Sequence, residues 1–406
     1  MNIYTSFGKE SQLTATVSQR AIIGEMNLAF IDMGQGDCTI ISCPDNSVYI
    51  VDCGTTAELS DESFEEAKKL VRSWSRGKAV NVIMTHPDKD HYNKFIDLLC
   101  SKPKVEVNIF YFSRALSDKS PLGYYKERAM MRNIFLFGRP LLKEITLNGK
   151  KHISKTWAPV FDYQDPIEND IPEDGYVIKS GKTRKGFNWS LTIIAGNVPT
   201  VSRSASTKSN VVSLCTLVKF DKDKLLLTGD STDETLTYLY DKQKPRIKEV
   251  SIFQVPHHGS ESSLPTDNFK NWVNPESLLV SVGLLVTSFN LPRYDVMSRW
   301  LTCSRLRDMP RTYQYWQYGM EGYDTFKDLQ RILDVEWKNY DWDQNDSRTF
   351  FWLKDPKDAG PKKSGTGFFG FSYKNWFLFR AESKKDLYQT GVIGSWFDED
   401  FVPPTL

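Results

Sequence analysis

The sequence predicts an α/β protein built as a four-layer αββα sandwich, in which two sheets pack face to face and helices cover both outer faces. Strand patterns and helix patterns alternate in both halves of the chain, as this architecture requires. Four of the five histidines fall in two short motifs, Thr85 to His91 and Val255 to Ser260, and each motif follows an apolar run. We therefore expect a functional site where these loops meet, at one edge of the sheets.

In the first half, residues 26–56 contain three short strands, LAFIDM, CTIIS and VYIVDC, separated by the turn formers GQGD and PDNS. An amphipathic helix is expected from about Glu62 to Ser75, with Asp61 as its cap and Gly77 closing it. The strand AVNVIMT then runs into the first histidine motif. A second helix, from about Asn93 to Cys100, and the strand VEVNIFYF are expected next.

Residues 113–190 have weak periodicity and a mild excess of basic residues. A solvated, loop-rich insertion is the expected explanation, and a track for a polyanion is the alternative. Strand patterns return in SLTIIAGN, VVSLCTLVKF and DKLLLTGD. A helix from about Asp233 to Tyr240 and the strands VSIFQVP and SLLVSVG complete the expected second sheet.

From Trp300 onward the chain is rich in aromatic residues and contains seven of the eleven tryptophans. The segments FFW and FFGFSYKNWFLF resemble strands, whereas Lys354 to Gly367 resembles an exposed loop. Aromatic rings can stack on nucleic-acid bases, but filling a core or an inter-domain seam is the expected role here. We expect residues 300–406 to dock on the preceding domain, and a protein partner or a second copy could bind there.

Composition favours a soluble protein of the cytoplasm. The net charge is +1, so no overall field points to a polyanionic partner. The six cysteines contain no C-x-x-C pair and are expected to be reduced, mainly buried thiols. The first residues lack the apolar core of a signal peptide, and the stretch from Leu278 to Val286 is far shorter than the ~20 residues that span a bilayer. No membrane segment is expected.

The two histidine motifs predict a metal centre, with satisfied surface histidines as the alternative. His86 and Asp88 would hold one ion, and Asp90 and His91 its neighbour. Asp230, at the end of the apolar run LLLTGD, could bridge both ions, and His258 would complete the second site. Paired metals about 3.5–4 Å apart can share a hydroxide and stabilise an in-line displacement. The chemistry indicated is hydrolysis, because no G-x-S-x-G or Walker A motif competes.

Six motifs in order carry a family resemblance: FIDMGQGD, VDCGT, THPDKDH, NVVSL, LLLTGD and VPHHGS. With them, residues 26–292 resemble metallo-β-lactamase-fold hydrolases, and specifically the metallohydrolase domain of ComEC-type competence proteins. The resemblance implies a hydrolase domain over residues 26–299, after a lead of residues 1–25. It also implies two divalent ions, Mn²⁺ or Zn²⁺, and DNA as the substrate.

Carried over residue by residue, the resemblance implies a metal set of His86, Asp88, Asp90, His91, Asp230 and His258. Asp37 and Asp52 match acidic positions that support the metal loop, with ordinary turn chemistry as the alternative. His257 is expected to orient a ligand or touch substrate. The residues with candidate catalytic roles are Asp90, Asp230 and His257. The candidate substrate contacts are Asn93, Lys94, Asn210 and Ser260.

Four positions depart from the family pattern. Asn93 and Lys94 replace glycines, Asn210 stands where many members carry a histidine ligand, and Leu291 lies where a late histidine is common. The leading hypothesis is a cytosolic metal-dependent nuclease that degrades DNA, with bacterial defence as a plausible setting. The alternatives are a hydrolase of a small phosphodiester or nucleotide, and a partner-binding subunit with little turnover.

Overall fold

The structure is a computed structural model of the chain, and it describes the following residues: 21–55 without 22, 32 and 34; 61–112 without 87; the short strands 145–147, 150–152 and 157–159; 175–200 without 184; 209–281 without 276; parts of 291–305; and the strands 314–318, 348–352, 365–373 and 376–384. Expectations for the N-terminal lead, for most of the insertion and for the loop before residue 365 lie outside these residues.

One large sheet comes mainly from the first half of the chain. Its strand order is β17-β18-β1-β2-β3-β4-β5-β8. The bounds are β1 Met26–Ile31, β2 Thr39–Ser42, β3 Val48–Val51, β4 Val80–Met84, β5 Val107–Phe112, β8 Trp157–Pro159, β17 Gly365–Tyr373 and β18 Trp376–Lys384. Strands β3, β4, β5 and β8 run parallel to one another, and the others pair antiparallel.

A second sheet comes from the second half, in the order β14-β13-β12-β11-β10-β9. Its bounds are β9 Tyr176–Lys182, β10 Asn188–Ala195, β11 Cys215–Phe220, β12 Asp223–Leu227, β13 Ile252–Gln254 and β14 Ser277–Leu279. Strands β12, β13 and β14 are parallel. Two separate two-stranded antiparallel sheets pair β6 Ile145–Leu147 with β7 Lys150–His152, and β15 Gln314–Tyr318 with β16 Arg348–Trp352.

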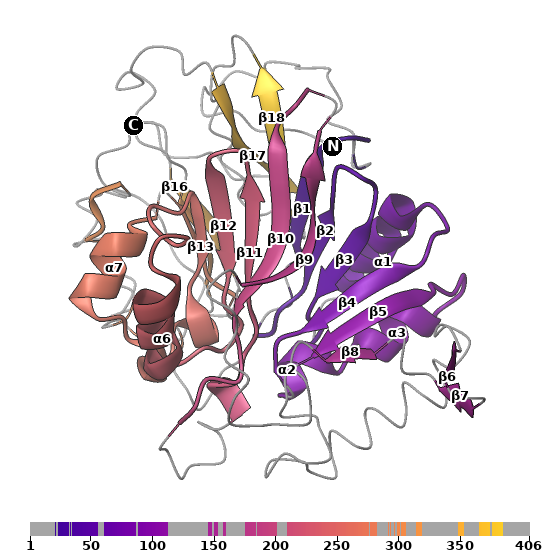
Figure 1. The fold of residues 1–406 in the computed structure, drawn as a ribbon, viewed down its shortest axis with the longest axis horizontal. Coiled ribbons are helices and arrows are strands. Elements are labelled where there is room, and N and C mark those ends of the chain that lie inside the picture. The colour runs from indigo at the N-terminus through magenta and orange to yellow at the C-terminus, as the bar shows by residue number, and fades with distance from the viewer. Residues whose placement is uncertain are drawn as a thin grey trace.

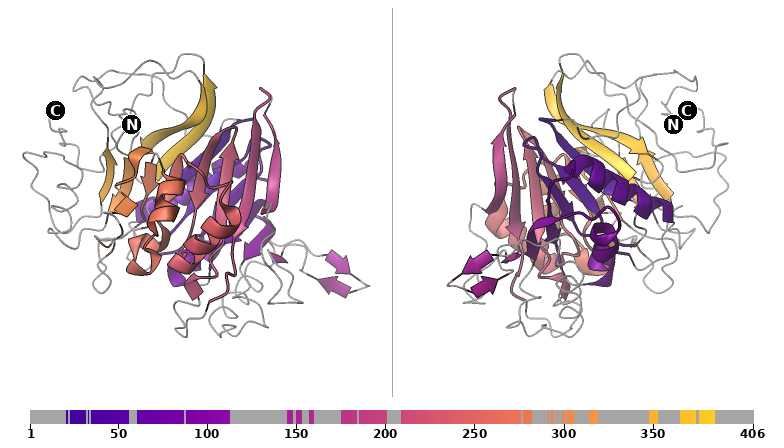
Figure 2. Two further views of the ribbon diagram at one scale, coloured as in Figure 1. Left: turned by 60° about the vertical axis from the view of Figure 1, so that its left-hand side comes forward. Right: turned by 90° about the vertical axis from the view of Figure 1, so that its right-hand side faces the viewer.

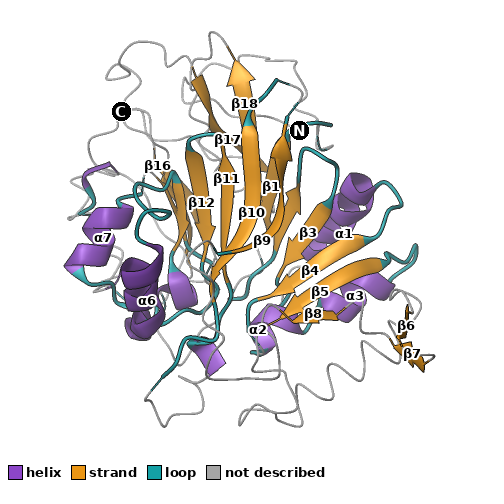
Figure 3. Cartoon of the chain, in the orientation of Figure 1, coloured by secondary structure: helices purple, strands orange, loops and turns teal. Residues whose placement is uncertain are grey.

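Helices lie on the outer face of each sheet, and the two sheets face each other (Figures 1 and 3). Helices α1 Asp61–Ser75 and α3 Phe95–Cys100 cover the first sheet, while α6 Asp233–Gln243 and α7 Asp267–Val273 cover the second. Three separate apolar cores fill the spaces between these four layers. The expected αββα architecture is therefore present in the part of the chain that the structure describes.

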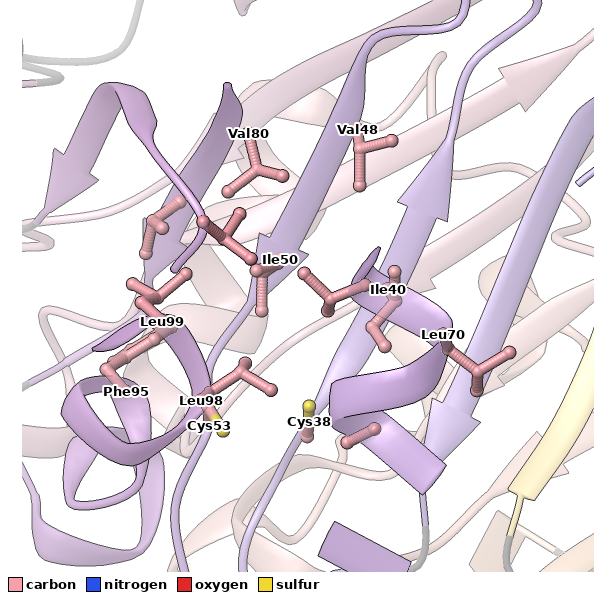
Figure 4. Close-up of a cluster of buried hydrophobic side chains, with 14 of the residues drawn as sticks. Cys38, Ile40, Val48, Ile50, Cys53, Leu70, Val80, Phe95, Leu98 and Leu99 are labelled. Carbon is pink, nitrogen blue, oxygen red and sulfur yellow. The ribbon is translucent and has the colours of Figure 1, made fainter. Parts of the chain in front are cut away.

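Alternation along the strands explains how one sheet supports two cores. Ile40 and Ile50 point toward α1 and α3, whereas their neighbours Ile41 and Tyr49 point toward the second sheet. Successive strand side chains face opposite sides, so a strand buried on both faces has an almost continuous apolar sequence. Figure 4 shows the helix-side cluster, in which Leu70 of α1 and Leu98 of α3 pack over Ile40 and Ile50.

The helix that we predicted from Asn93 to Cys100 differs from the structure. A short helix, α2 Lys89–Tyr92, forms within the first histidine motif, and α3 begins only at Phe95. Asp90 and His91 therefore lie on a helical turn rather than on an open loop.

The first amphipathic helix was predicted to within one residue, because Ala67, Leu70, Val71 and Trp74 form a single buried face.

The insertion contains more regular structure than the sequence indicated. β9 is a full strand of the second sheet, and it pairs with β10 from Tyr176 to Lys182. Its burial pattern alternates only weakly, with most side chains exposed, which explains why periodicity missed it. The insertion's other described strands are β6, β7, β8 and the start of β10.

The C-terminal region adds strands to the first sheet, as its aromatic runs suggested. β18 pairs antiparallel with β1 over six residues, from Met26↔Ala381 to Ile31↔Trp376, and β17 pairs with β18 (Figure 2). Trp300 is fully buried in the core under α7. Docking of residues 300–406 as a unit stays a prediction.

The five cysteines described as free thiols are all buried, as expected. No helix among the described residues combines the length and the apolar character that crossing a bilayer requires.

Candidate metal centre

The site forms where parallel strands of both sheets end. Asp52 follows β3, His86 follows β4, Asp230 follows β12, and His257 and His258 follow β13. Because parallel strands end at the same edge, residues far apart in the sequence meet there. This placement agrees with the sheet-edge site predicted from the sequence.

Asp52 fixes the first motif. Its Oδ1 accepts a hydrogen bond from the Thr85 backbone N–H (2.7 Å), and its Oδ2 accepts one from Thr85 Oγ1 (2.6 Å). The same Oδ2 lies 2.8 Å from His91 Nδ1. A carboxylate only accepts, so His91 donates from Nδ1 to Asp52, and its Nε2 faces Asp230. Asp52 adopts a left-handed backbone conformation (φ 55°), which Asp tolerates better than most residues.

His258 is fixed in the same way by a different partner. Its Nδ1 donates to the backbone carbonyl of Ser281, at 2.6 Å, so its Nε2 also faces the site. Both His257 and His258 have positive φ values, 51° and 53°, which is unusual for bulky side chains. Strain of this kind persists where the surrounding structure holds it in place, and it concentrates at functional sites.

The two carboxylate oxygens of Asp230 face different groups of nitrogens. Oδ1 lies 3.1 Å from His91 Nε2 and 3.4 Å from His258 Nε2. Oδ2 lies 3.6 Å from His86 Nε2 and 3.7 Å from His257 Nε2. Asp230 thus stands between two sets of imidazoles, as a bridging ligand would.

The acidic residues of the first motif extend these two groups. Asp90 Oδ2 lies 3.5 Å from His258 Nε2, on the Oδ1 side of Asp230. Asp88 Oδ2 lies 3.7 Å from His86 Nε2, on the Oδ2 side, and Asp88 Oδ1 accepts a hydrogen bond from Ser209 Oγ. Three-residue groups close enough to hold an ion include His86, His91 and Asp230, and Asp90, His91 and His258.

The donor set fits metal ions. The Nε2 atoms of His86, His91 and His258, and Oδ1 of Asp230, are fully buried and have no hydrogen-bond partner among the described residues. A buried polar atom without a partner costs about 1–3 kcal/mol, so four of them converging on one point need compensation. Divalent cations supply it, since imidazole nitrogens and carboxylate oxygens are their ordinary ligands.

The ionisable groups of the centre perturb one another. Burial favours the neutral forms, but the imidazoles of His91 and His258 hold the pKa of Asp230 well below its usual range. Burial likewise opposes the charge on His258, yet Asp230 and Asp90 raise its pKa to about 9. Burial raises the pKa of Asp37 to about 6 and lowers that of His257. Opposed shifts of this size are typical of functional sites.

The four candidate substrate contacts differ in where they lie relative to the candidate metal centre. The Asn93 amide bonds both backbone groups of Thr55, accepting from N (2.9 Å) and donating to O (2.7 Å). Lys94 lies with Nζ 5.5 Å from the Phe64 ring. Asn210 lies beside His257, and Ser260 accepts a hydrogen bond from Ser262. Asn210 and Ser260 thus adjoin the centre, whereas Asn93 holds the Thr55 loop; all four substrate roles stay predictions.

Several residues of the site were missed by sequence reasoning. Thr85 bonds Asp52, and Gln254 donates to Asp37 Oδ2 (2.9 Å) while its Oε1 accepts from the Thr228 backbone (2.9 Å). Ser281 supports His258. One signal was available for Gln254: it is a polar residue in a buried strand, directly before the second histidine motif. Leu291, in place of the family's late histidine, is buried in the core beside α7.

No protein-family model matches the chain, and no curated protein sequence does. Solved structures with some similarity include human tRNase Z, short form, at 12% identity and a TM-score of 0.35, covering 63% of this chain and 92% of that one. The metallo-β-lactamase fold protein YhfI from Bacillus subtilis has 9% identity and a TM-score of 0.33, with coverage of 68% and 93%. CmlA, a diiron β-hydroxylase from Streptomyces venezuelae, has 12% identity and a TM-score of 0.37, with coverage of 70% and 50%.

Proposed function

We propose that the chain is a metal-dependent phosphodiester hydrolase, and specifically a nuclease that degrades DNA in the cytoplasm. The observation that carries the metal-dependent part is the position of Asp230: its Oδ1 faces the buried Nε2 atoms of His91 and His258, and its Oδ2 faces that of His86. A carboxylate in that position can join two cations and reduce their mutual repulsion.

The ligand groups divide on either side of Asp230. His86 and Asp88 would hold one divalent ion with Oδ2, and Asp90, His91 and His258 would hold the other with Oδ1. Ions bound there would supply Lewis acidity toward a phosphoryl oxygen and would lower the pKa of water. Mn²⁺ or Zn²⁺ suits this mixture of oxygen and nitrogen donors.

The protein's own groups orient these ligands before substrate arrives. Asp52 sets the tautomer of His91, Ser281 that of His258, and Ser209 orients Asp88. Such partners raise ligand basicity and reduce the reorganisation that binding requires.

Asp88 and His257 are the most exposed members of the centre, with 40% and 22% of their side chains accessible, whereas His86 is fully buried. Substrate would therefore approach from the side of Asp88 and His257.

The choice of a phosphodiester rests on the ordered motifs from FIDMGQGD to VPHHGS and on their ComEC-type resemblance. The Nε2 atoms of His86, His91 and His258 are buried and cannot contact a large polymer directly. A nucleic-acid backbone would instead present one phosphate at the exposed edge of the centre. A smaller phosphodiester could bind at the same edge, so the substrate must be decided by assay.

The test is a substrate panel run with purified protein and Mn²⁺. Labelled single-stranded DNA, double-stranded DNA, RNA and a cyclic dinucleotide are incubated with the wild type and with Asp230→Asn. We expect DNA to be cleaved by the wild type and spared by the variant. Cleavage of the cyclic dinucleotide alone would replace the nuclease with a small-molecule hydrolase. Equal traces of activity in both proteins would indicate contamination and a chain with little turnover.

A further inference from the structure

Asp37 has a buried carboxylate oxygen that the six-residue ligand set does not use. Only 4% of the residue is exposed, and its Oδ1 has no hydrogen-bond partner in the described part of the chain. The other oxygen, Oδ2, accepts a hydrogen bond from Gln254 Nε2 at 2.9 Å. Burying a carboxylate oxygen is costly unless a positive or hydrogen-donating group compensates it. Asp37 Oδ1 lacks the compensation that Oδ2 has.

The Asp37 carboxylate lies at the candidate metal centre. Asp37, Asp230 and His258 each offer one donor atom, and the three atoms lie within 4.8 Å of one another. Two ligands on opposite sides of one ion, with bonds of about 2.0–2.6 Å, lie about 4–5 Å apart. His258 Nε2 also lies 3.4 Å from Asp230 Oδ1. The three residues are therefore close enough to hold one ion on the Oδ1 side of Asp230.

Hydrogen bonds explain the other group of possible ligands that contains Asp37. That group is Asp37, Asp52 and His91. Both oxygens of Asp52 already accept hydrogen bonds, from Thr85 and from His91 Nδ1, so protons satisfy them.

The group with Asp230 and His258 differs, because each of its members contributes a buried atom without a hydrogen-bond partner among the described residues. These atoms are Oδ1 of Asp37, Oδ1 of Asp230 and Nε2 of His258. Two of them belong to carboxylates, which repel each other in a buried place unless a cation lies between them. An ion at this point would compensate all three atoms at once.

The backbone holds Asp37 directly against the first histidine motif. Its N–H donates to the carbonyl of Asp90 (3.1 Å), and its carbonyl accepts from the N–H of Gly54 (3.1 Å). A Cβ on Gly36 would lie 2.1 Å from Gly54 O, and a Cβ on Gly54 would lie 2.4 Å from the carbonyl carbon of Asp90. Glycine at both positions is therefore what lets the Asp37 turn approach the centre so closely.

Ser281 joins the Asp37 turn to the histidine of the same group. Its hydroxyl donates to the carbonyl of Gly36, and its own carbonyl accepts from His258 Nδ1 at 2.6 Å. One residue thus fixes both the turn that carries Asp37 and the ring of His258. Partners of this kind orient ligands before an ion binds.

We propose that Asp37 is a metal ligand, which binds through Oδ1 the ion that Asp230 Oδ1 and His258 also bind. The inference rests on the proposed metal centre and goes beyond the supporting role that the family resemblance implies for Asp37. It adds a carboxylate to the Oδ1 side of Asp230. Oxygen donors favour hard ions such as Mn²⁺, so this side of the centre should prefer Mn²⁺ more strongly than the six-residue set alone indicates.

Asp37→Asn distinguishes a ligand from a support. Gln254 Oε1 accepts from the backbone N–H groups of Thr228 (2.9 Å) and Gly229 (3.3 Å), so Nε2 is the atom that faces Asp37. The oxygen of the introduced amide must then accept from Gln254. Its NH₂ group, which only donates, takes the place of Oδ1. The variant keeps the support and loses the ligand oxygen.

The test measures Mn²⁺ and Co²⁺ binding by calorimetry and elemental analysis, and the visible spectrum of the Co²⁺ form reports its ligands. The matched control is Asp241→Asn, at an exposed position on α6. Wild type and control should bind two ions. Asp37→Asn should keep one ion and bind the other more than about 100-fold more weakly with a changed Co²⁺ spectrum, because losing a ligand exceeds the 10–100-fold cost of losing a ligand's partner.

The metal-free proteins give a second readout. The Tm of metal-free Asp37→Asn should be no lower than that of metal-free wild type, because the variant removes a buried charge close to Asp230. Gln254→Met makes the opposite change, since it removes the support and keeps Asp37 Oδ1. It should lower the Tm of the metal-free protein and leave the Co²⁺ spectrum like that of the wild type.

Two ions bound with wild-type affinity and an unchanged Co²⁺ spectrum in Asp37→Asn would overturn the ligand role of Asp37 and leave the proposed hydrolase intact. If Asp37→Asn does not fold, the same comparison is decided with Asp37→Ser, whose single hydroxyl can accept from Gln254. Failure of the wild type to bind any ion would instead overturn the proposed function itself.

Discussion

The carboxylate of Asp52 lies 2.8 Å from Nδ1 of His91, and both side chains are buried at the junction of β3 and the first histidine motif. This contact decides which nitrogen of His91 is available to a metal. It also joins the end of β3 to a candidate ligand that follows β4, the next strand in the sheet. Two elements 39 residues apart are thus joined at the centre of the site.

Asp52→Asn should weaken metal binding while the chain stays folded. Asn tolerates the left-handed backbone that Asp52 adopts, so the change mainly removes the charge that supports His91. We expect Mn²⁺ affinity to fall by about 10–100-fold, measured by titration calorimetry. The matched control is Asp221→Asn, at another left-handed position (φ 53°) in the turn between β11 and β12. Equal affinities in the two variants would contradict this role of Asp52.

Removal of metal should lower the thermal stability of the protein. Chelation leaves the buried nitrogens of His86, His91 and His258 without partners, and ions that bind only the folded state stabilise it by mass action. At a free Mn²⁺ concentration of about 100 times Kd, one bound ion raises the free energy of unfolding by about 2.7 kcal/mol. Scanning calorimetry would show this increase as a higher Tm. A Tm that is the same with Mn²⁺ and with chelator would show that the folded chain holds no such ions.

Asp88→His should move the metal preference for turnover from Mn²⁺ toward Zn²⁺. Asp88 gives the centre an additional oxygen donor, and oxygen ligands suit Mn²⁺ whereas imidazoles suit Zn²⁺. The wild type should therefore turn over faster with Mn²⁺, and the variant should narrow or reverse the ratio. Rates are compared at equal metal occupancy. A wild type that is faster with Zn²⁺ would contradict this interpretation of Asp88.

Gly229→Ala should destabilise the protein by more than alanine does at an uncrowded position with a positive φ. A Cβ at Gly229 (φ 52°) would lie 2.7 Å from Thr85 Oγ1, the group that Asp52 holds. Gly77→Ala is the matched control, because its φ is also positive (75°) and nothing lies within 4 Å of its Cβ. The backbone change should lower the free energy of unfolding of both variants by about 1–2 kcal/mol. Urea unfolding should show a larger decrease for Gly229→Ala than for Gly77→Ala. Equal losses would mean that the Thr85 contact adapts without cost.

Much of the fold and most of the centre could be predicted because local patterns encode them. Apolar runs mark β1 to β5 and β10 to β13, and His86, Asp90, His91, Asp230 and His258 each follow such a run and meet at the sheet edge. The partners of these ligands were harder to predict. Thr85, Gln254 and Ser281 act through single hydrogen bonds that only the tertiary structure creates.

The elements that we did not predict from the sequence lack a clear local pattern. β9 is largely exposed, so it lacks the apolar alternation that identifies a strand. The short helix α2 contains two candidate ligands and too few residues to generate a helical period. Asn93 is expected at the substrate because it replaces a glycine. Its amide bonds the backbone of Thr55, and its role toward substrate stays a prediction.

The central claim is that Asp230 joins two metal sites, and Asp230→Asn tests it most directly. The variant keeps the shape of the side chain and removes the charge that faces both groups of imidazoles. Asp241→Asn, at an exposed position on α6, is the matched control. Metal content and DNA cleavage are measured on the same samples after reconstitution with Mn²⁺. We predict that Asp230→Asn stays folded, holds fewer than two ions and cleaves DNA at least about 100-fold more slowly, while Asp241→Asn matches the wild type. Two bound ions and near-normal cleavage in Asp230→Asn would contradict the account.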